Sequence, residues 1–311
     1  MYNGVIIVNK EKGFTSHDVV AKLRGILKQK KIGHTGTLDP DATGVLPVCL
    51  GHATKLCDML TDKDKTYETV MLLGKVTDTQ DISGQVLEEC DTDFLRQSGN
   101  LDDSKIMEVI NSFVGDYNQI PPMYSALKVN GKKLYELARE GIEIERKPRP
   151  VKIIAIDNVR IEYPRVYMTV SCSKGTYIRT LCHDIGQKLS CGACMEELKR
   201  TKVSTFGIED SLTLSEISSI VESAEGISSK LISVETIFEM YPKIITIEKY
   251  DRMLYNGNSV APFMLDTTEN VVLEDDKRYR MYDSIGQFIG IFYYNKKEKL
   301  VKCDKMFFAA K

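Results

Sequence analysis

The sequence lacks any apolar run long enough to cross a membrane. It also lacks a secretory segment, because Met1 to Gly4 lead into the apolar run Val5 to Val8 without a basic region or a cleavage site. Nor do its 311 residues carry charge of one sign, since the formal net charge is −2. These absences exclude a membrane-spanning or uniformly basic protein, and we expect a globular protein of the cytoplasm.

The eight cysteines lack the dense spacing of a secreted disulfide framework, which favours a reducing compartment. Cys191 and Cys194 have the spacing of half a zinc site, with Cys182 and His183 a few residues earlier. No second pair of cysteine or histidine ligands follows, so buried free thiols are the favoured interpretation. No clustered set of acidic ligands is present either, and we expect no metal.

The charges are instead segregated along the chain, as RNA binding by a nearly neutral protein requires. Acidic residues concentrate around Glu88 to Asp93 and Glu274 to Asp276. One basic cluster alone is usually solvated surface, but three of them beside the same motifs favour RNA binding. The clusters are Lys22, Arg24, Lys28, Lys30 and Lys31; Lys128, Lys132, Lys133, Arg139, Arg146, Lys147, Arg149 and Lys152; and Lys199, Arg200 and Lys202.

Hydrophobic periodicity predicts a mixed α/β fold in two parts, residues 1–240 and 241–311. In the first part it predicts strands at Val5 to Val8, Lys65 to Leu73 and Val166 to Cys172, and helices capped by Ser16, spanning Thr176 to Leu189, and capped by Thr213 with Glu216. In the second part it predicts a small β-rich module with strands at Ile244 to Ile247, Val271 to Leu273, Arg278 to Tyr282 and Phe288 to Tyr293.

The most unusual local sequence runs from Gly33 to Pro47, with three glycines and two prolines. This composition predicts a shaped loop rather than a helix or a regular strand, and its backbone can approach a ligand closely. The spacing of a phosphate-binding glycine loop is absent. The candidates for chemistry within it are His34, Asp39 and Asp41, which alone make only a weak carboxylate site.

Gly33 to Pro47, continued by Val48 to Gly51 and Ala53 to Lys55, resembles the central motif of bacterial TruB-type pseudouridine synthases. Further segments of the same family follow in order and cover the first two hundred residues. They are Lys65 to Tyr67, Thr77 to Thr79 with Asp81 and Gly84, Gln119 to Lys128, Lys133 to Arg139, and Ser173 to Arg179. Six motifs in family-like order make coincidence a poor explanation.

The resemblance implies a tRNA pseudouridine synthase, an isomerase that acts on uridine 55 in the T-arm of tRNA without a cofactor. By the same resemblance Asp39 is the catalytic nucleophile, as carboxylates are in glycosidic chemistry. A buried aspartate needs a partner more than it needs activation, and we expect Arg179 to hold it charged through a paired hydrogen bond.

A uridine must leave its stack to reach Asp39, which costs a few kcal/mol, and aromatic stacking of about 1–3 kcal/mol per base can offset that cost. We expect Tyr67 and Tyr177 to provide the stacking surface, with Tyr67 also a candidate acceptor of the C5 proton. Leu198 would pack on the uracil, and His34 would contact the gap that the flipped nucleotide leaves. Lys55 and Lys10 are further candidate substrate contacts.

The segment of about 119–150 resembles the mobile RNA-clamping insertion of stand-alone enzymes, with Lys128, Lys132 and Lys133 as clamp residues. Guide-RNA-dependent relatives of the dyskerin type lack this insertion. The C-terminal strands resemble a PUA-type RNA-binding module. We therefore expect a monomer that binds tRNA without an obligatory protein partner. The sequence departs from the family pattern at Glu11 and His52, outside the proposed catalytic set.

Two other classes of function remain open at this point. A non-catalytic RNA-binding or tRNA-folding protein would keep the fold, but it would have no need for Asp39, Tyr67, Tyr177 and Arg179 together. A metal-dependent hydrolase or nuclease would require acidic ligands, for which the sequence provides no cluster.

Overall fold

The computed structural model describes residues 1–129, 131–223, 226–266 and 271–307. The strands of its larger sheet are β1 (Gly4–Lys10), β2 (Ile32–His34), β3 (Thr43–Leu50), β4 (Lys65–Leu73), β7 (Gly115–Gln119), β10 (Arg149–Glu162), β11 (Arg165–Cys172), β12 (Ala193–Val203) and β13 (Phe206–Gly207). They run in the order β1, β3, β12, β4, β11, β10, β7, with β2 beside β3 and β13 beside β12. The pair β3–β12 is parallel and the other pairs are antiparallel, which confirms the predicted mixed sheet.

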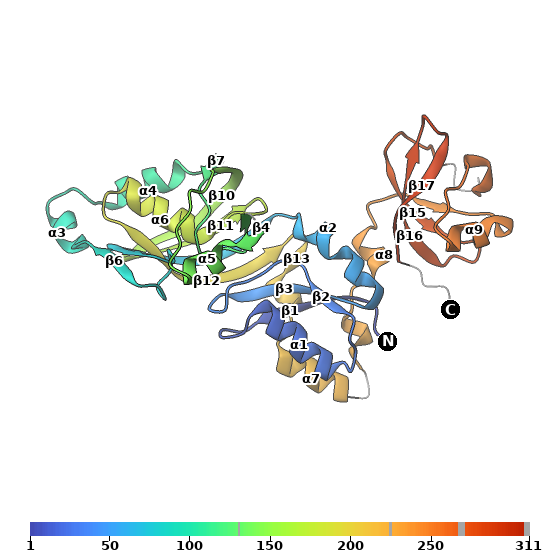
Figure 1. The fold of residues 1–311 in the computed structure, drawn as a ribbon, viewed down its shortest axis with the longest axis horizontal. Coiled ribbons are helices and arrows are strands. Elements are labelled where there is room, and N and C mark those ends of the chain that lie inside the picture. Colours follow the sequence, from blue (N-terminus) through green and yellow to red (C-terminus); the bar gives the residue numbers. More distant parts are fainter. Residues whose placement is uncertain (130, 224–225, 267–270, 308–311) are drawn as a thin grey trace.

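Helices cover the two halves of this sheet separately (Figure 1). The helices α1 (Ser16–Ile26) and α7 (Leu214–Glu222) pack against β1 and β3 through one apolar core. The helices α4 (Asp103–Asn111) and α6 (Ile178–Lys188) pack against β4, β10, β11 and β12 through another. The site described below lies where these two halves meet, at the parallel pair β3–β12.

The first helix begins one residue earlier than the sequence predicted. Thr15, not Ser16, is its N-cap, and Thr15 and Asp18 form a reciprocal capping box. Ser16 is buried, and its hydroxyl accepts a hydrogen bond from the backbone N–H of Leu38 at 2.9 Å. The helix start is thereby fastened to the loop that carries Asp39.

The predicted loop from Gly33 to Pro47 is shorter in the structure, because both of its ends are strands. Only residues 35–42 connect β2 to β3. Gly44 continues β3 with a φ of +102°, a conformation that glycine tolerates and other residues rarely adopt. Pro47 also lies within β3, where its carbonyl accepts a hydrogen bond from the N–H of Thr35. The expectation of an unpaired loop was therefore wrong at its two ends.

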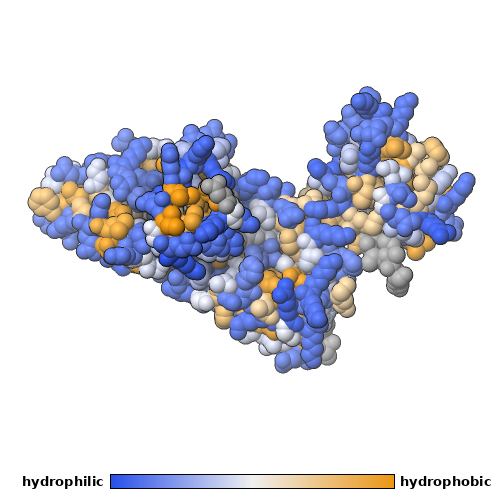
Figure 2. Space-filling model, viewed as in Figure 1, coloured by the Kyte–Doolittle hydropathy of each residue, from blue (hydrophilic) through white to orange (hydrophobic). Residues whose placement is uncertain are grey.

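The connections between the strands of the larger sheet contain several short elements. They are α2 (Cys57–Thr61), β5 (Lys75–Thr77), β6 (Val86–Glu89), α3 (Thr92–Gln97), β8 (Lys128–Val129), β9 (Lys132–Lys133) and α5 (Leu134–Arg139). The last three belong to the insertion and have a small core of their own, made by Met123, Leu134 and Leu137. Figure 2 shows an apolar patch over this insertion, and the insertion has exposed apolar side chains at Val129 and Ile142.

The C-terminal part contains α8 (Val234–Ile237), β14 (Lys243–Ile245), α9 (Asp251–Tyr255), β15 (Arg278–Tyr282), β16 (Phe288–Asn295) and β17 (Leu300–Met306). These strands form a second sheet in chain order, which confirms the β-rich module. Val271 to Leu273 form no strand, however. The hydroxyl of Tyr279 donates to the carbonyl of Val272 and accepts from the N–H of Glu274, so a side chain takes the place of a strand partner there. The strand β17 was not predicted.

Aromatic side chains dock the C-terminal sheet onto the larger one. Phe238 stacks on Tyr241, Phe288 stacks on Phe307, and both pairs join an apolar core that includes Val5 of β1. Figure 1 shows the C-terminal sheet set to the side of the larger sheet, with α2 and α8 between them. Short 3₁₀ turns complete the described chain at Gly51–Leu56, Ile208–Asp210, Ile227–Lys230, Glu248–Tyr250 and Pro262–Met264. Each helix that the structure describes is too short or too polar to span a membrane.

Candidate active site

The loop of residues 35–42 presents Asp39 at the protein surface, and hydrogen bonds from the protein interior fix the backbone of this loop. The carbonyl of Pro40 accepts hydrogen bonds from the N–H of Gly13 at 2.9 Å and from the ammonium of Lys10 at 3.1 Å. Leu38 is buried, and its N–H is bound by Ser16. The side chain of Asp39 keeps 45% of its surface exposed, so a fixed backbone offers its carboxylate to a ligand.

Arg179 lies almost fully buried beside Asp39. Its Nε is 3.1 Å from Asp39 Oδ2. The rest of the guanidinium donates to the carbonyls of Thr79 and Tyr124, and Nη1 also lies 3.5 Å from Asp81 Oδ2. Arg179 therefore lies beside Asp39 as predicted. It contacts the carboxylate through Nε alone, however, and not through two parallel hydrogen bonds. The other side of the guanidinium is occupied by two segments that fix its orientation.

Tyr67 and Leu198 lie on the neighbouring strands β4 and β12, in the apolar core that also contains Leu38. Tyr67 is 9% exposed, and burial raises the pKa of its phenol. The charge of Asp39 also raises this pKa, so Tyr67 lies near the carboxylate, whereas Leu198 is partly buried against the same core.

Tyr177 is the residue that precedes α6, and Gln119 fixes its backbone. The amide of Gln119 donates to the carbonyl of Tyr177 at 2.9 Å and accepts from its N–H at 2.8 Å. Burial raises the pKa of the Tyr177 phenol, with smaller opposing effects from Ser125 and Arg179. Gln119 was expected only as part of a motif, and periodicity gave no indication that it positions the tyrosine.

His34 ends β2 and stands edge-on to His17, with their ring centres 5.3 Å apart. Its Nδ1 lies 3.2 Å from the carbonyl of Gly36, within the loop that carries Asp39. Burial lowers the pKa of His34, so the neutral ring is favoured near neutral pH. His17, at the exposed start of α1, was not among the predicted residues.

Two lysines that we expected to contact the substrate have other partners in the structure. Lys10 is completely buried, and its ammonium donates to the carbonyls of Glu11, Phe14 and Pro40. It therefore supports the Asp39 loop and does not offer its charge to the surface. Lys55 is exposed, but its ammonium donates to the carbonyl of Met306 at 2.8 Å, which ties the larger sheet to the end of β17.

The three predicted clamp lysines lie together on the hairpin of β8 and β9. Lys128 and Lys132 are exposed, and Lys132 forms a surface ion pair with Glu140 at 3.3 Å. Lys133 is half-buried beside the ring of Tyr135, whose hydroxyl it contacts at 3.0 Å. The pair with Glu140 is solvated and contributes little to stability, so Lys132 remains available to an anionic ligand.

Arg200 differs most from its expected position, because the sequence grouped it with Lys199 and Lys202 as surface charge. It is 2% exposed, on β12 between β3 and β4. Its Nε donates to the carbonyl of Val45 at 2.8 Å. The alternation of a regular strand gave no signal for this burial, because Arg200 and Lys202 are two residues apart and would share one face of the sheet.

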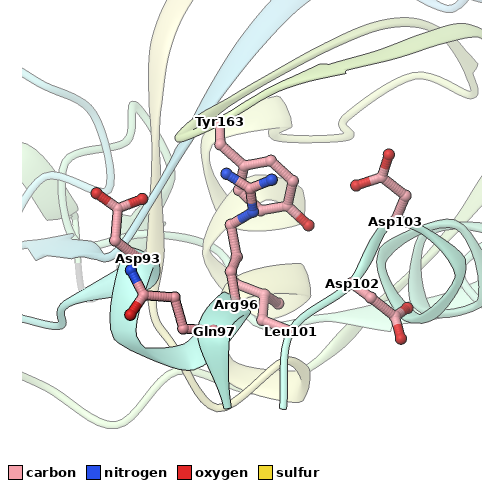
Figure 3. Close-up of a pocket in the computed structure, with 7 residues that line it drawn as sticks. All are labelled: Asp93, Arg96, Gln97, Leu101, Asp102, Asp103 and Tyr163. Carbon is pink, nitrogen blue, oxygen red and sulfur yellow. The ribbon is translucent and has the colours of Figure 1, made fainter. Parts of the chain in front are cut away.

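A cavity of about 480 Å³ opens elsewhere, between α3, the start of α4 and the end of β10. Figure 3 shows the guanidinium of Arg96 stacked on the ring of Tyr163, 3.7 Å from its centre, with acidic side chains on either side. None of the residues that line it belongs to the predicted site. The described residues contain no group of three histidine, cysteine or acidic side chains that could hold a metal. Burial raises the pKa of Cys194 to about 11, which disfavours the thiolate that zinc requires.

Comparisons with known proteins find relatives over nearly the whole chain. Residues 24–178 match the family model described as TruB family pseudouridylate synthase (N terminal domain), and residues 179–239 match the one described as tRNA pseudouridylate synthase B C-terminal domain. The chain is 51% identical over 315 residues to tRNA pseudouridine synthase B of Lachnoclostridium phytofermentans, covering 98% of this chain and 99% of that protein. It is 44% identical over 305 residues to the protein of the same name from Clostridium perfringens, with 98% of each covered.

The chain also resembles solved structures over nearly its whole length. One is an H/ACA RNP bound to a substrate RNA containing 2′-deoxyuridine, with a TM-score of 0.70 and 25% identity, covering 98% of this chain and 85% of that one. Another is a Cbf5-Nop10-Gar1 complex, with a TM-score of 0.69 and 26% identity over the same shares of the two chains.

Proposed function

The chain belongs to the TruB family of pseudouridylate synthases, which isomerise uridine to pseudouridine in tRNA, and we propose that its target is uridine 55 in the T-arm. The order of the motifs in the first two hundred residues supports this target. So do the basic side chains of the β8–β9 hairpin, which lie within the insertion and can contact phosphates.

We propose that Asp39 is the catalytic nucleophile. The isomerisation breaks the bond between C1′ and N1, forms one between C1′ and C5, and moves a proton from C5 to N1. Reactant and product have the same composition, so the reaction consumes no co-substrate. The observation that carries the proposal is the ion pair between the buried Arg179 and the half-exposed Asp39, which keeps one carboxylate charged and aimed outward.

The surrounding residues would then hold the flipped uridine. Tyr67 and Tyr177 would stack on the base, and Leu198 would pack against the uracil. Tyr67 would accept the C5 proton. His34 would contact the gap in the RNA, since its neutral ring lies beside the Asp39 loop. Lys10 enters this proposal only as a support for Pro40.

We propose that residues 1–240 form the catalytic domain and residues 241–311 a PUA-like RNA-binding module. The separate sheets of the two parts support this division. One chain contributes Asp39, Tyr67 and Arg179, which supports a monomer that acts without a protein partner. We place it in the cytoplasm, where tRNA is modified, and we infer no cofactor.

The test replaces Asp39 with asparagine, which keeps the shape of the side chain but removes its charge. Purified protein is incubated with an unmodified tRNA transcript, and any pseudouridine is mapped by position. We expect wild-type protein to modify position 55 and Asp39→Asn to form no product, with tRNA affinity within about tenfold of wild type.

Asp41→Asn is the matched control, because Asp41 lies on the same loop and is exposed. It should keep wild-type turnover. Full activity of Asp39→Asn would refute the role of Asp39. Product at another uridine would refute the target. Tight tRNA binding by the wild type without any product would favour the RNA-binding alternative.

A further inference from the structure

Arg200 lies at the centre of the sheet, next to the strands that carry the proposed chemistry. On one side its register partner is Tyr67 of β4, and on the other it is Gly44 of β3, at the end of the Asp39 loop. Directly opposed residues on neighbouring antiparallel strands face the same side of the sheet, with their Cβ atoms about 4.5–5.5 Å apart. The side chain of Arg200 therefore shares its face with the phenol of Tyr67.

The guanidinium of Arg200 has no acidic partner among the residues that the structure describes. Apart from the bond of Nε to the carbonyl of Val45, its Nη2 is buried without a hydrogen-bond partner. Burial lowers the pKa of both Lys10 and Lys65, and the charge of Arg200 lowers each further, so two more basic groups lie near Arg200. A buried charge without a counter-ion and a buried donor without an acceptor both oppose folding, so this arrangement calls for an explanation.

Tyr67 is the neighbour on which this charge acts. Burial raises the pKa of Tyr67, and the guanidinium of Arg200 is the main influence that lowers it. The other groups that face the phenol are Cys172 of β11 and Asp39 of the loop, which both raise its pKa. Cys172 has a pKa of about 11 and stays neutral near physiological pH. Arg200 thus favours the deprotonated form of Tyr67, whereas burial, Cys172 and Asp39 oppose it.

We propose that Arg200 is a positioning residue that stabilises the phenolate of Tyr67, the form that accepts the proton from C5. In this step the C5–H bond breaks, its electron pair returns to the pyrimidine ring, and the proton forms an O–H bond with the phenolate oxygen. The proton that Tyr67 carries at rest leaves earlier, to solvent. The unpartnered Nη2 then gains an anionic acceptor. This inference rests on the proposed role of Tyr67 in the reaction.

The test compares Arg200→Met and Arg200→Lys with wild type in single-turnover reactions at neutral pH, on saturating tRNA transcript with hydrogen or deuterium at C5 of its uridines. We expect Arg200→Met to be about a hundredfold slower and to show a larger isotope effect than wild type, because proton transfer from C5 to Tyr67 then limits the rate. Arg200→Lys keeps the charge with a shorter reach, so its rate and its isotope effect should change less.

A merely structural role predicts a different result, namely a slower reaction with the same isotope effect as wild type. That result would overturn the inference. Gln29→Leu is the stability control, because Gln29 is also buried and donates to the backbone carbonyls of Tyr2 and Lys31, away from the site. It should keep the wild-type rate and isotope effect. If Arg200→Met does not fold, the isotope effect of Arg200→Lys decides, and an unchanged isotope effect overturns the inference.

Tyr67→Phe and Asp39→Asn separate this inference from the proposed function. An inactive Asp39→Asn with a fully active Tyr67→Phe would leave the role of Asp39 intact and remove the inference about Arg200. A fully active Asp39→Asn would refute the proposed function itself, whatever the Arg200 variants show.

Discussion

Arg179 shows how a single buried side chain can fix an exposed one. Its guanidinium donates hydrogen bonds to the carbonyls of Thr79 and Tyr124, and these two bonds fix its orientation independently of Asp39. The carboxylate then has one well-placed cation on its inner side and solvent on its outer side. A charge that is held by preorganised groups needs little reorganisation during a reaction, which is the main source of electrostatic catalysis.

Lys10 yields a pH prediction, because burial lowers its pKa from 10.5 to about 8. Below pH 8 the ammonium is charged in both states, and the folded protein bears the full cost of burying it. Between pH 8 and 10.5 the folded state releases this proton before the unfolded state does, so stability rises with pH. We expect the free energy of unfolding of wild type, relative to Lys10→Met, to increase by on the order of 3 kcal/mol across this range.

Urea denaturation of both proteins at pH 7.5 and pH 10.5 measures this difference. The comparison cancels the titration of groups that the two proteins share. A relative stability that stays flat or falls with pH would show that the ammonium of Lys10 is not buried as a charge.

Individual site residues could be predicted from motifs but not from charge alone. Asp39, Arg179 and Tyr67 were predicted together, and the structure brings them together. Arg200 was misplaced because Lys199, Arg200 and Lys202 look like one surface cluster. In the strand, Arg200 points inward, and an irregularity after it in the pairing of β12 with β4 returns Lys202 to the surface. A local irregularity of this kind leaves no mark on the hydrophobic pattern.

Among the elements, β3 carries a glycine that no other residue can easily replace. A Cβ at Gly44 would lie 2.2 Å from the carbonyl oxygen of Arg200, and the φ of +102° disfavours any other residue. We expect Gly44→Ala to destabilise the protein by more than about 2 kcal/mol and to reduce turnover by displacing Arg200. Denaturation and the single-turnover assay measure the two effects.

The variant Gly36→Ala separates the effect of backbone strain from the effect of a steric clash at the new Cβ. Gly36 has a φ of +106° and open space where its Cβ would be, so it adds a strained residue without a clash. Equal losses of stability in the two variants would mean that the close approach of β3 and β12 is unimportant.

The β8–β9 hairpin yields a prediction about RNA binding. We expect replacement of Lys128, Lys132 and Lys133 by glutamine to weaken tRNA binding and to flatten its dependence on salt, because fewer counter-ions are released. Affinity measured at several salt concentrations gives the slope. The matched control replaces Lys75, Lys105 and Lys188 by glutamine, which changes the net charge equally outside the insertion. An unchanged slope in the hairpin variant would remove these lysines from the interface.

Helices and strands with a regular hydrophobic pattern were predicted better than those that contain residues unusual for their type. Alternation identified β4 and β11, and the Thr213 capping box identified α7. The strand β3 was missed because Gly44 and Pro47 are individually unfavourable in strands, and only its pairing with β1 accommodates both. The apolar run Val271 to Leu273 had the composition of a strand, but a tyrosine hydroxyl holds it instead.

For the whole molecule, the docking of the C-terminal sheet depends on Phe307. Its ring stacks on Phe288 and is nearly buried in the core shared with β1. We expect Phe307→Ala to lower stability by about 3 kcal/mol, to speed proteolysis between the two sheets and to weaken tRNA binding. Phe94→Ala is the control, because Phe94 is 65% exposed. Equal rates of proteolysis in both variants would contradict the docking role.

The division into two sheets could be read from the change in hydrophobic pattern near residue 240, but their docking could not. Lys55 was assigned to RNA because its motif and charge suggested that role. Its actual partner, the carbonyl of Met306, lies 251 positions further along the chain. A contact between segments so far apart has no local signature in the sequence.

The pairing of β3 with β12 also determines how much of the chain must be synthesised before the proposed active site can form. Arg200 reaches Val45 across 155 positions of sequence. During synthesis, a ribosome makes the Asp39 loop long before it makes Arg179, Leu198 and Arg200. A growing chain therefore displays the Asp39 carboxylate without its guanidinium, and on the proposed mechanism chemistry on tRNA waits until translation has passed β12.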